Sequence, residues 1–144
     1  MTSLHDAIGK PVILRETAEQ LGEVRFFTVD AADRRVTALV ASSGRSHRIV
    51  DWAQIQNIGP DAVIVETSRE PTGEDDRLIS GAANALDKRV LSDRGNELGS
   101  VADATVDDQG SVQSIAVGDQ QVDGTRLEGV GSYAVVVAAD PTEA

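Results

Sequence analysis

The sequence predicts an all-β protein built from two small antiparallel β-barrels in tandem. The stretch "LGEVRFFTVD" at residues 21–30 returns as "LGSVADATVD" at residues 98–107. The chain of 144 residues is rich in Val, Ile and Ala and holds only two Phe, one Trp and one Tyr, a composition that suits narrow barrels. Short apolar runs bounded by turn residues are typical of such barrels.

The repeat extends over most of the chain. "AIGKPVIL" at residues 7–14 matches "ALDKRVLS" 78 residues later, "RVTALVA" matches "SVQSIAV" 76 later, and "IGPDAVIV" matches "VGSYAVVV" 72 later. The offset shrinks because the second copy has shorter connections. Two copies favour two tandem domains over a solenoid. We predict a first repeat at residues 1–66, a linker at 67–84 and a second repeat at 85–144.

Each copy then predicts the same order of short strands. They are expected at residues 11–14, 24–29, 36–41 and 62–65 in the first copy, and at 89–91, 101–106, 112–117 and 134–137 in the second. Gly22 and Gly99 are expected to hold a positive φ or to allow close approach of another strand. The spacing of Val24, Phe27 and Val29 breaks strict alternation and indicates a β-bulge.

The remaining segments connect these strands. "RIVDWAQIQNIG" at residues 48–59 predicts a further short strand and then one helical or 3₁₀ turn around residues 51–55. The second copy compresses this part. Residues 67–80, "TSREPTGEDDRLIS", have the composition of a polar linker, and residues 78–86 could form one or two helical turns leading into the second copy.

The charge balance argues against binding to nucleic acid. The formal net charge is −11 and the pI is about 4.4, whereas phosphate backbones reward clustered Lys and Arg. Residues 1–66 carry seven basic and nine acidic side chains, a difference of −2, while residues 67–144 carry six and fifteen, a difference of −9. An anionic partner would therefore contact the first half.

Several other classes of protein are also disfavoured. The absence of cysteine excludes disulfides and thiolate metal sites and fits a reducing cytoplasm. The first residues lack the features of a signal peptide, and no apolar run reaches the roughly 18–20 residues of a membrane helix. We expect a soluble, cytoplasmic protein.

No pattern of catalytic or metal-ligating residues stands out. Nucleophile elbows, phosphate loops and HExxH helices are absent, and His5 and His47 lie far apart. The acidic runs at residues 74–76 and 107–108 supply too few ligands for a calcium loop. We predict a protein that is not an enzyme and that binds no cofactor or metal ion.

One basic concentration occurs in this acidic chain. Arg34 and Arg35 precede a predicted strand, and Arg45 and Arg48 follow it. They could contact an anion or an acidic partner. The alternative is a solvated loop that balances nearby carboxylates, and short charge runs favour that alternative.

Two aromatic residues are further candidates for partner contact. Trp52 could plug one end of a barrel or anchor an interface, and the plug is the favoured hypothesis. Phe26 and Phe27 point to opposite faces of a regular strand, so an exposed Phe26 would form a contact surface.

The sequence resembles the PRC-barrel family, small β-barrels found in the photosynthetic reaction-centre H subunit and in the C-terminal part of the ribosome maturation factor RimM. The resemblance is carried by "GKPVIL", "LGEVRFFTVD", "RVTALVA" and "IVDWAQIQNIGPDAVIV", and in the second copy by "DKRVLS", "GNELGSVADATVDDQGSVQSIAV" and "LEGVGSYAVVV". The second copy lacks a match to Trp52.

The resemblance implies a docking or assembly module and supplies no catalytic residues. We therefore expect binding to another protein, or self-association, through barrel surfaces. The first alternative is an accessory in RNA processing or ribosome assembly, which requires the arginines to form one continuous surface. The second is a small ligand bound between the two barrels.

Overall fold

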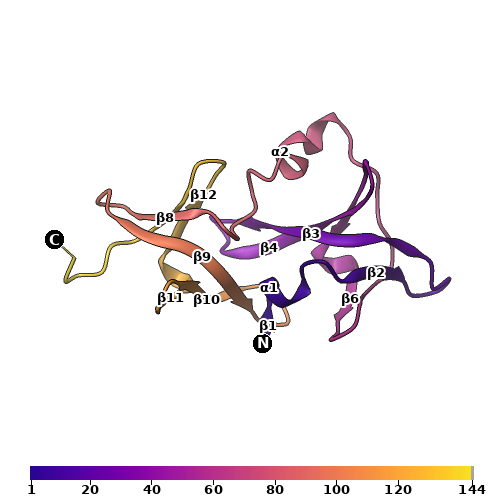
Figure 1. The fold of residues 1–144 in the computed structure, drawn as a ribbon, viewed down its shortest axis with the longest axis horizontal. Coiled ribbons are helices and arrows are strands. Elements are labelled where there is room, and N and C mark those ends of the chain that lie inside the picture. The colour runs from indigo at the N-terminus through magenta and orange to yellow at the C-terminus, as the bar shows by residue number, and fades with distance from the viewer. Residues whose placement is uncertain (144) are drawn as a thin grey trace.

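The computed structural model describes residues 1–143 and places the two repeats side by side along its long axis (Figure 1). The first half holds β1 (Thr2–Ser3), α1 (Leu4–Ala7), β2 (Pro11–Leu14), β3 (Gln20–Asp30), β4 (Arg35–Ser43), β5 (Ser46–Asp51), the 3₁₀ turn η1 (Trp52–Gln54), β6 (Ile55–Ile58) and β7 (Val63–Val65). Between the repeats lie η2 (Gly73–Asp75) and α2 (Asp76–Ile79). The second half holds β8 (Arg89–Ser92), β9 (Glu97–Val106), β10 (Val112–Val117), β11 (Gln120–Asp123), η3 (Gly124–Arg126), β12 (Leu127–Val130) and β13 (Val135–Val137).

The two repeats share one strand order. The first sheet runs β5-β4-β3-β2-β7-β6 and the second runs β11-β10-β9-β8-β13-β12, with β1 added to β9. The expected short strand and 3₁₀ turn after β4 are present as β5 and η1. The internal repeat predicted from the sequence is therefore a repeat of structure.

The prediction of two closed antiparallel barrels needs correction, because the sheets are mixed and their strand paths are open. β2 pairs with β7 in parallel, with Val12 opposite Val63, and β8 pairs with β13 in parallel, with Val90 opposite Val135. Closure would require the two end strands of each path to pair. β5 and β6 stand at opposite ends of the first strand path and do not pair within the described residues, although only the three residues of η1 separate them.

The predicted bulge is confirmed in both repeats. Arg25 is the extra residue where β3 pairs with β4, and its counterpart Ala102 is the extra residue where β9 pairs with β10. A second irregularity skips Thr37 in β4 and its counterpart Gln113 in β10. Because bulges increase local twist, both sheets curl in the same way.

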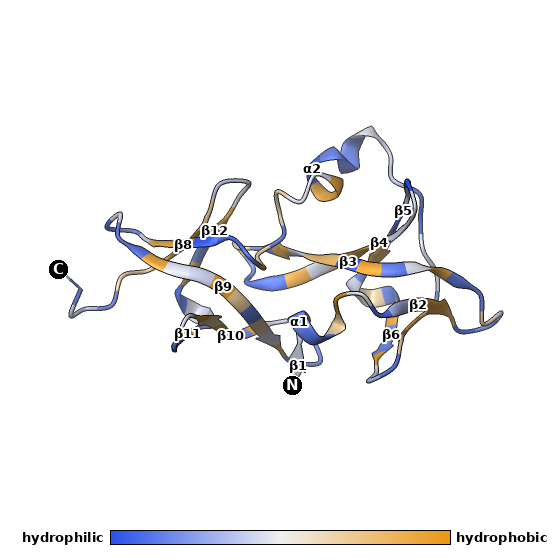
Figure 2. Cartoon of the chain, in the orientation of Figure 1, coloured by the Kyte–Doolittle hydropathy of each residue, from blue (hydrophilic) through white to orange (hydrophobic). Residues whose placement is uncertain are grey.

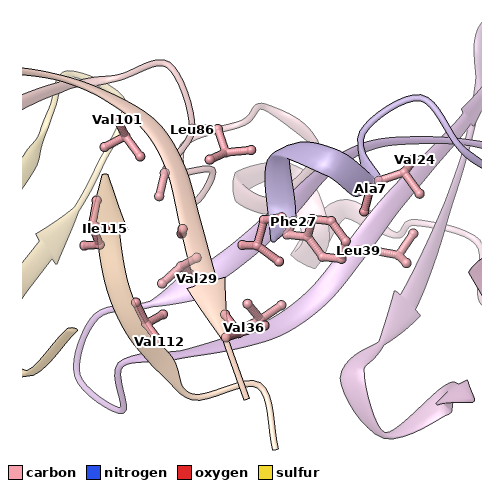
Figure 3. Packing of buried hydrophobic residues seen from close by; sticks show 14 of the residues in the cluster. Ala7, Val24, Phe27, Val29, Val36, Leu39, Leu86, Val101, Val112 and Ile115 are labelled. Atoms are coloured by element: carbon pink, nitrogen blue, oxygen red, sulfur yellow. The ribbon is translucent and has the colours of Figure 1, made fainter. Parts of the chain in front are cut away.

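A single hydrophobic cluster joins the repeats. Apolar and polar residues alternate along β9 (Figure 2), so this strand buries one face, whereas β3 buries four consecutive residues from Phe26 to Val29 and so buries both faces there. Val29 and Val36 of the first sheet and Val112 and Ile115 of the second belong to the same buried cluster (Figure 3). Two domains of about 70 residues would be marginal alone, and this shared core buries apolar surface of each against the other.

The chain between the repeats is held against the first sheet. The backbones of Ile49 and Arg69 exchange two hydrogen bonds of 2.9 Å, and Val29 N–H donates to the Ala83 carbonyl at 2.8 Å. α2 lies over β3 and β4 (Figure 1). The predicted linker segment is therefore joined by its backbone to the edge of the end strand β5 and to β3.

Candidate protein-docking surface

The four predicted arginines do not form one surface. Arg34 and Arg35 lie at the start of β4, while Arg45 lies in the turn beyond its other end and Arg48 lies on β5 opposite Ala41. The eight residue steps of β4 span roughly 26 Å at about 3.3 Å per residue. The condition for an RNA-binding patch, one continuous basic surface, is not met by these residues.

Arg34 and Arg35 bind the second repeat instead. Arg34 Nε donates to the Leu127 carbonyl at 2.9 Å, and Arg35 Nη2 donates to the Gln109 carbonyl at 2.7 Å. Both guanidinium groups thus satisfy backbone carbonyls across the junction between the repeats.

Arg48 lies in a charge-balanced environment. Its Nε donates to Ser68 Oγ at 2.9 Å, and its Nη1 lies 3.3 Å from Glu70 Oε1. Glu70 also lines the shallow depression beside Arg45. These contacts match the favoured interpretation of the segment, a solvated loop that balances nearby carboxylates.

Phe26 is buried, with 7% of its surface exposed, so the expectation of an exposed contact residue is wrong. It lies opposite Val40 in the sheet, and Val40 lies opposite Ile49. All three side chains are buried outside the shared cluster, on the opposite face of the sheet. A strand pattern records two apolar faces here and cannot show that the second one is buried.

Trp52 lies across the junction and packs on Gly110. A Cβ placed on Gly110 would lie 2.9 Å from Trp52 Cε2, so the indole contacts the backbone of the second repeat directly. The side chain is half-buried. Its position combines the two predicted roles, because it covers apolar residues and anchors an interface that lies within the chain.

The depression beside Trp52 is small. It encloses about 180 Å³ and is lined by Thr2, Ile55, Asp107 and Asp108 among others. Drug-sized ligands need roughly 300–1,000 Å³. Asp107 already accepts bonds of 2.9 Å from the backbone N–H groups of Gln109 and Ser111. Within residues 1–143, no group of three or more His, Asp or Glu side chains is placed to hold a metal ion.

A different exposed feature stands out on the second repeat. Tyr133 is 72% exposed, and the Arg89 guanidinium carbon lies 5.0 Å from the centre of its ring. Arg89 Nη1 also donates to the Tyr133 hydroxyl at 2.9 Å and lies 3.4 Å from Glu97 Oε1. The phenol is thus fixed in place although it faces solvent, because a cation–π contact and a hydrogen bond restrain it together.

Beside this ring lies an open apolar groove, which we call with it the Tyr133 surface. The groove is lined by Leu91, Gly129, Val130, Gly131, Ser132, Tyr133, Ala134, Val136 and Arg77. Leu91 and Val136 are paired neighbours on the outer face of the parallel strands β8 and β13. Both side chains remain partly exposed.

Positive charge borders the Tyr133 surface. Arg77 donates to the Val130 carbonyl at 3.3 Å, and within the described part of the chain no carboxylate forms an ion pair with it. Burial lowers the pKa of Lys88, and the nearby charge of Arg77 lowers it further. Arg77 and Arg89 therefore lie at this surface, while Lys88 Nζ donates to the Gly81 and Ala82 carbonyls at 2.7 and 3.0 Å.

Comparison of the two copies holds the signal for this surface. Tyr133 is the only tyrosine, and it stands in "VGSYAVVV" where the first copy has Asp61 in "IGPDAVIV". Because the two copies share one fold, that fold does not require an aromatic residue at this position. The change from Asp61 to Tyr133 therefore points to a role of Tyr133 outside the fold. The predicted contact residues all lie in the first copy, so Tyr133 was not among them.

The strand order, the bulges and the shared core define a tandem of two small mixed β-sheet domains. The family model of the PRC-barrel domain matches residues 1–70. This match shows that the first repeat belongs to the PRC-barrel family. No curated protein matches the chain in the comparison. Within residues 1–143, no helix has the length and apolar character needed to cross a membrane.

Proposed function

We propose that this protein is a non-catalytic docking module that binds an extended segment of another protein at the Tyr133 surface. The observation that carries the proposal is the restrained, 72% exposed ring of Tyr133 beside the apolar groove. Tyr and Arg are the residue types that most often dominate binding energy at protein interfaces. A side chain that is already ordered loses little conformational entropy when a partner binds.

The chemistry of the surface defines the partner. Leu91, Val130 and Val136 offer an apolar contact, and Arg77 and Arg89 lie on its borders. A segment that places an aliphatic or aromatic side chain in the groove and an acidic side chain beside Arg77 would match both features.

The sheet face, rather than the sheet edge, is the accessible element. β12 is the end strand of its sheet, and end strands can pair with an incoming strand. However, Arg34 and Arg77 already donate to the Leu127 and Val130 carbonyls at the two ends of β12. Both arginines would have to move before a partner strand could pair along the whole of β12.

Selection of displayed peptides against the immobilised full chain tests the proposal. We expect the enriched peptides to combine an apolar residue with Asp or Glu. Tyr133→Ala should weaken their binding roughly thirtyfold, the effect of about 2 kcal/mol typical of an interface hot spot. Gln121→Ala, an exposed change on β11 of the same repeat, is the matched control and should leave binding unchanged.

Two results would contradict the proposal: the absence of enriched peptides, or equal binding of these peptides to the Tyr133→Ala variant. Light scattering at increasing protein concentration tests whether a second copy of this chain binds the Tyr133 surface instead. A dimer that forms in the parent protein and is lost on Tyr133→Ala would identify a second copy of this chain, instead of another protein, on the surface.

A further inference from the structure

The two repeats meet about an approximate two-fold axis. Arg35 and Ser111 are counterparts 76 residues apart, and they form an antiparallel bridge with each other. Val36 N–H donates to the Gly110 carbonyl at 2.8 Å, and Val112 N–H donates to the Arg34 carbonyl, also at 2.8 Å. Each bond is the image of the other, as in a dimer whose subunits use the same patch.

One side of the axis joins a large residue to a glycine. Trp52 of the first repeat packs on Gly110 of the second, where a Cβ would lie 2.9 Å from Trp52 Cε2 and 3.1 Å from Trp52 Nε1. Real Cβ atoms essentially never approach another heavy atom this closely. Any side chain at position 110 would therefore displace the indole.

The other side of the axis joins the opposite residue types. The counterpart of Gly110 is Arg34, which reaches the Leu127 carbonyl at 2.9 Å. The counterpart of Trp52, 72 residues along the chain, is Gly124. A Cβ on Gly124 would lie 1.9 Å from the Val112 carbonyl oxygen, so η3 sits too close to β10 to carry a side chain there.

From these two unlike contacts we infer that the junction faces are a matched pair, in which the face of repeat 1 accepts a repeat 2 face and excludes a second repeat 1. Pairing of two first repeats would place the Arg34 side chain against Trp52, where only a glycine fits. Pairing of two second repeats would place Gly124 opposite Gly110 and leave the space of an indole empty. Both like pairings are thus disfavoured, one by overlap and one by a gap.

This inference concerns a surface other than the Tyr133 surface and does not depend on the proposed function. The partner that fits the junction face of repeat 1 is repeat 2, either of the same chain or of a second copy. The backbone hydrogen bonds, which both repeats make in the same way, hold the two faces together. The Trp52 and Arg34 contacts, which differ between the repeats, favour the unlike pairing over the like pairings.

A double-mutant cycle in the full chain tests the inference. Gly110→Arg introduces the residue of the first repeat and creates the like pairing on one side. Trp52→Gly combined with Gly110→Arg reproduces on this side the residue types that the other side already has. Gly95→Arg is the matched control, because Gly95 has φ +88, close to the +82 of Gly110, but nothing within 4 Å of its Cβ.

We expect Gly110→Arg to raise the equilibrium constant of urea-induced unfolding at least about tenfold more than Gly95→Arg does. In the Trp52→Gly background the effect of Gly110→Arg should shrink by at least about tenfold, while that of Gly95→Arg stays the same. Equal effects of the two arginine substitutions, or additive effects in the cycle, would overturn the inference.

If Gly110→Arg does not fold, Gly110→Ala and its control Gly95→Ala replace it in the same cycle. Trp52 is the only tryptophan of the chain, so its fluorescence gives a second readout. Gly110→Ala should shift the emission to longer wavelength as the indole moves into solvent, and an unchanged emission spectrum would contradict the inference.

Discussion

Gly22 and Gly99 are counterparts with similar backbones and different neighbours, so replacing each by alanine separates two sources of strain. Their φ angles are +144° and +134°. A Cβ on Gly22 would lie 2.5 Å from the Ser42 carbonyl oxygen. A Cβ on Gly99 would lie 3.2 Å from Val117 Cγ1, which is a side-chain atom. We predict that Gly22→Ala destabilises the protein much more than Gly99→Ala.

The magnitude follows from these contacts. A residue with a side chain at such a φ costs about 1–3 kcal/mol of strain, which both substitutions share. Ser42 pairs with Glu23 on one side and with His47 on the other, so its carbonyl cannot move without disturbing two ladders. Crowding of this kind adds roughly 1–3 kcal/mol. We expect about 2 kcal/mol for Gly99→Ala and about 4 kcal/mol for Gly22→Ala.

Urea unfolding followed by both Trp52 fluorescence and far-ultraviolet circular dichroism measures the two values. Coincident transitions with unchanged slopes would license the comparison of unfolding free energies. A difference between the variants of less than about 0.5 kcal/mol would show that φ alone sets the effect, and the argument from the Ser42 contact would then be refuted.

Three further predictions concern the core, the segment between the repeats and the Tyr133 surface. Phe27→Ala should lower the unfolding free energy by about 3–5 kcal/mol in urea titrations, because this side chain is 1% exposed within the shared cluster. The Arg69 guanidinium and the Thr72 N–H group hold the pKa of Asp75 below its usual value, so Asp75 stabilises the protein at neutral pH and this contribution is lost as the pH falls below about 4. Asp75→Asn should therefore lower the unfolding free energy at pH 7, and its difference from the parent protein should vanish in acid titrations. A difference in unfolding free energy that does not change with pH would contradict this role of Asp75. Tyr133→Ala should change the unfolding free energy by no more than about 0.5 kcal/mol while weakening peptide binding roughly thirtyfold, and a large loss of stability would show that the ring supports the fold.

The repeat, the order of the strands and the bulge are features that local sequence patterns carry. Turn residues and alternation mark each strand, and the departure from alternation at Val24, Phe27 and Val29 marks the bulge at Arg25. The parallel pairing of Val12 with Val63 is different. A short apolar run does not determine which strand it pairs with or in which direction. The prediction of antiparallel barrels was therefore wrong, and the sheets are mixed and open.

For the predicted contact residues too, the sequence indicates the residue types and only the tertiary structure shows their neighbours. Their residue types were correctly recognised as unusual in this chain, but their neighbours lie far away in sequence: Arg34 meets Leu127, and Trp52 meets Gly110. Phe26 is buried on the face of the first sheet opposite to the shared cluster. Tyr133, in contrast, is 72% exposed, and Arg89 contacts its ring.

The sequence by itself therefore determined the two-fold repetition, the β class and the strands of each sheet, because these depend on the alternation and turn propensity of nearby residues. Only the tertiary structure decided which apolar faces are covered and which arginines are used within the chain. It also decided that Tyr133 stays open to solvent beside an apolar groove. These outcomes depend on contacts between residues far apart in the chain, such as Trp52 with Gly110 and Arg34 with Leu127, and no local pattern records such contacts.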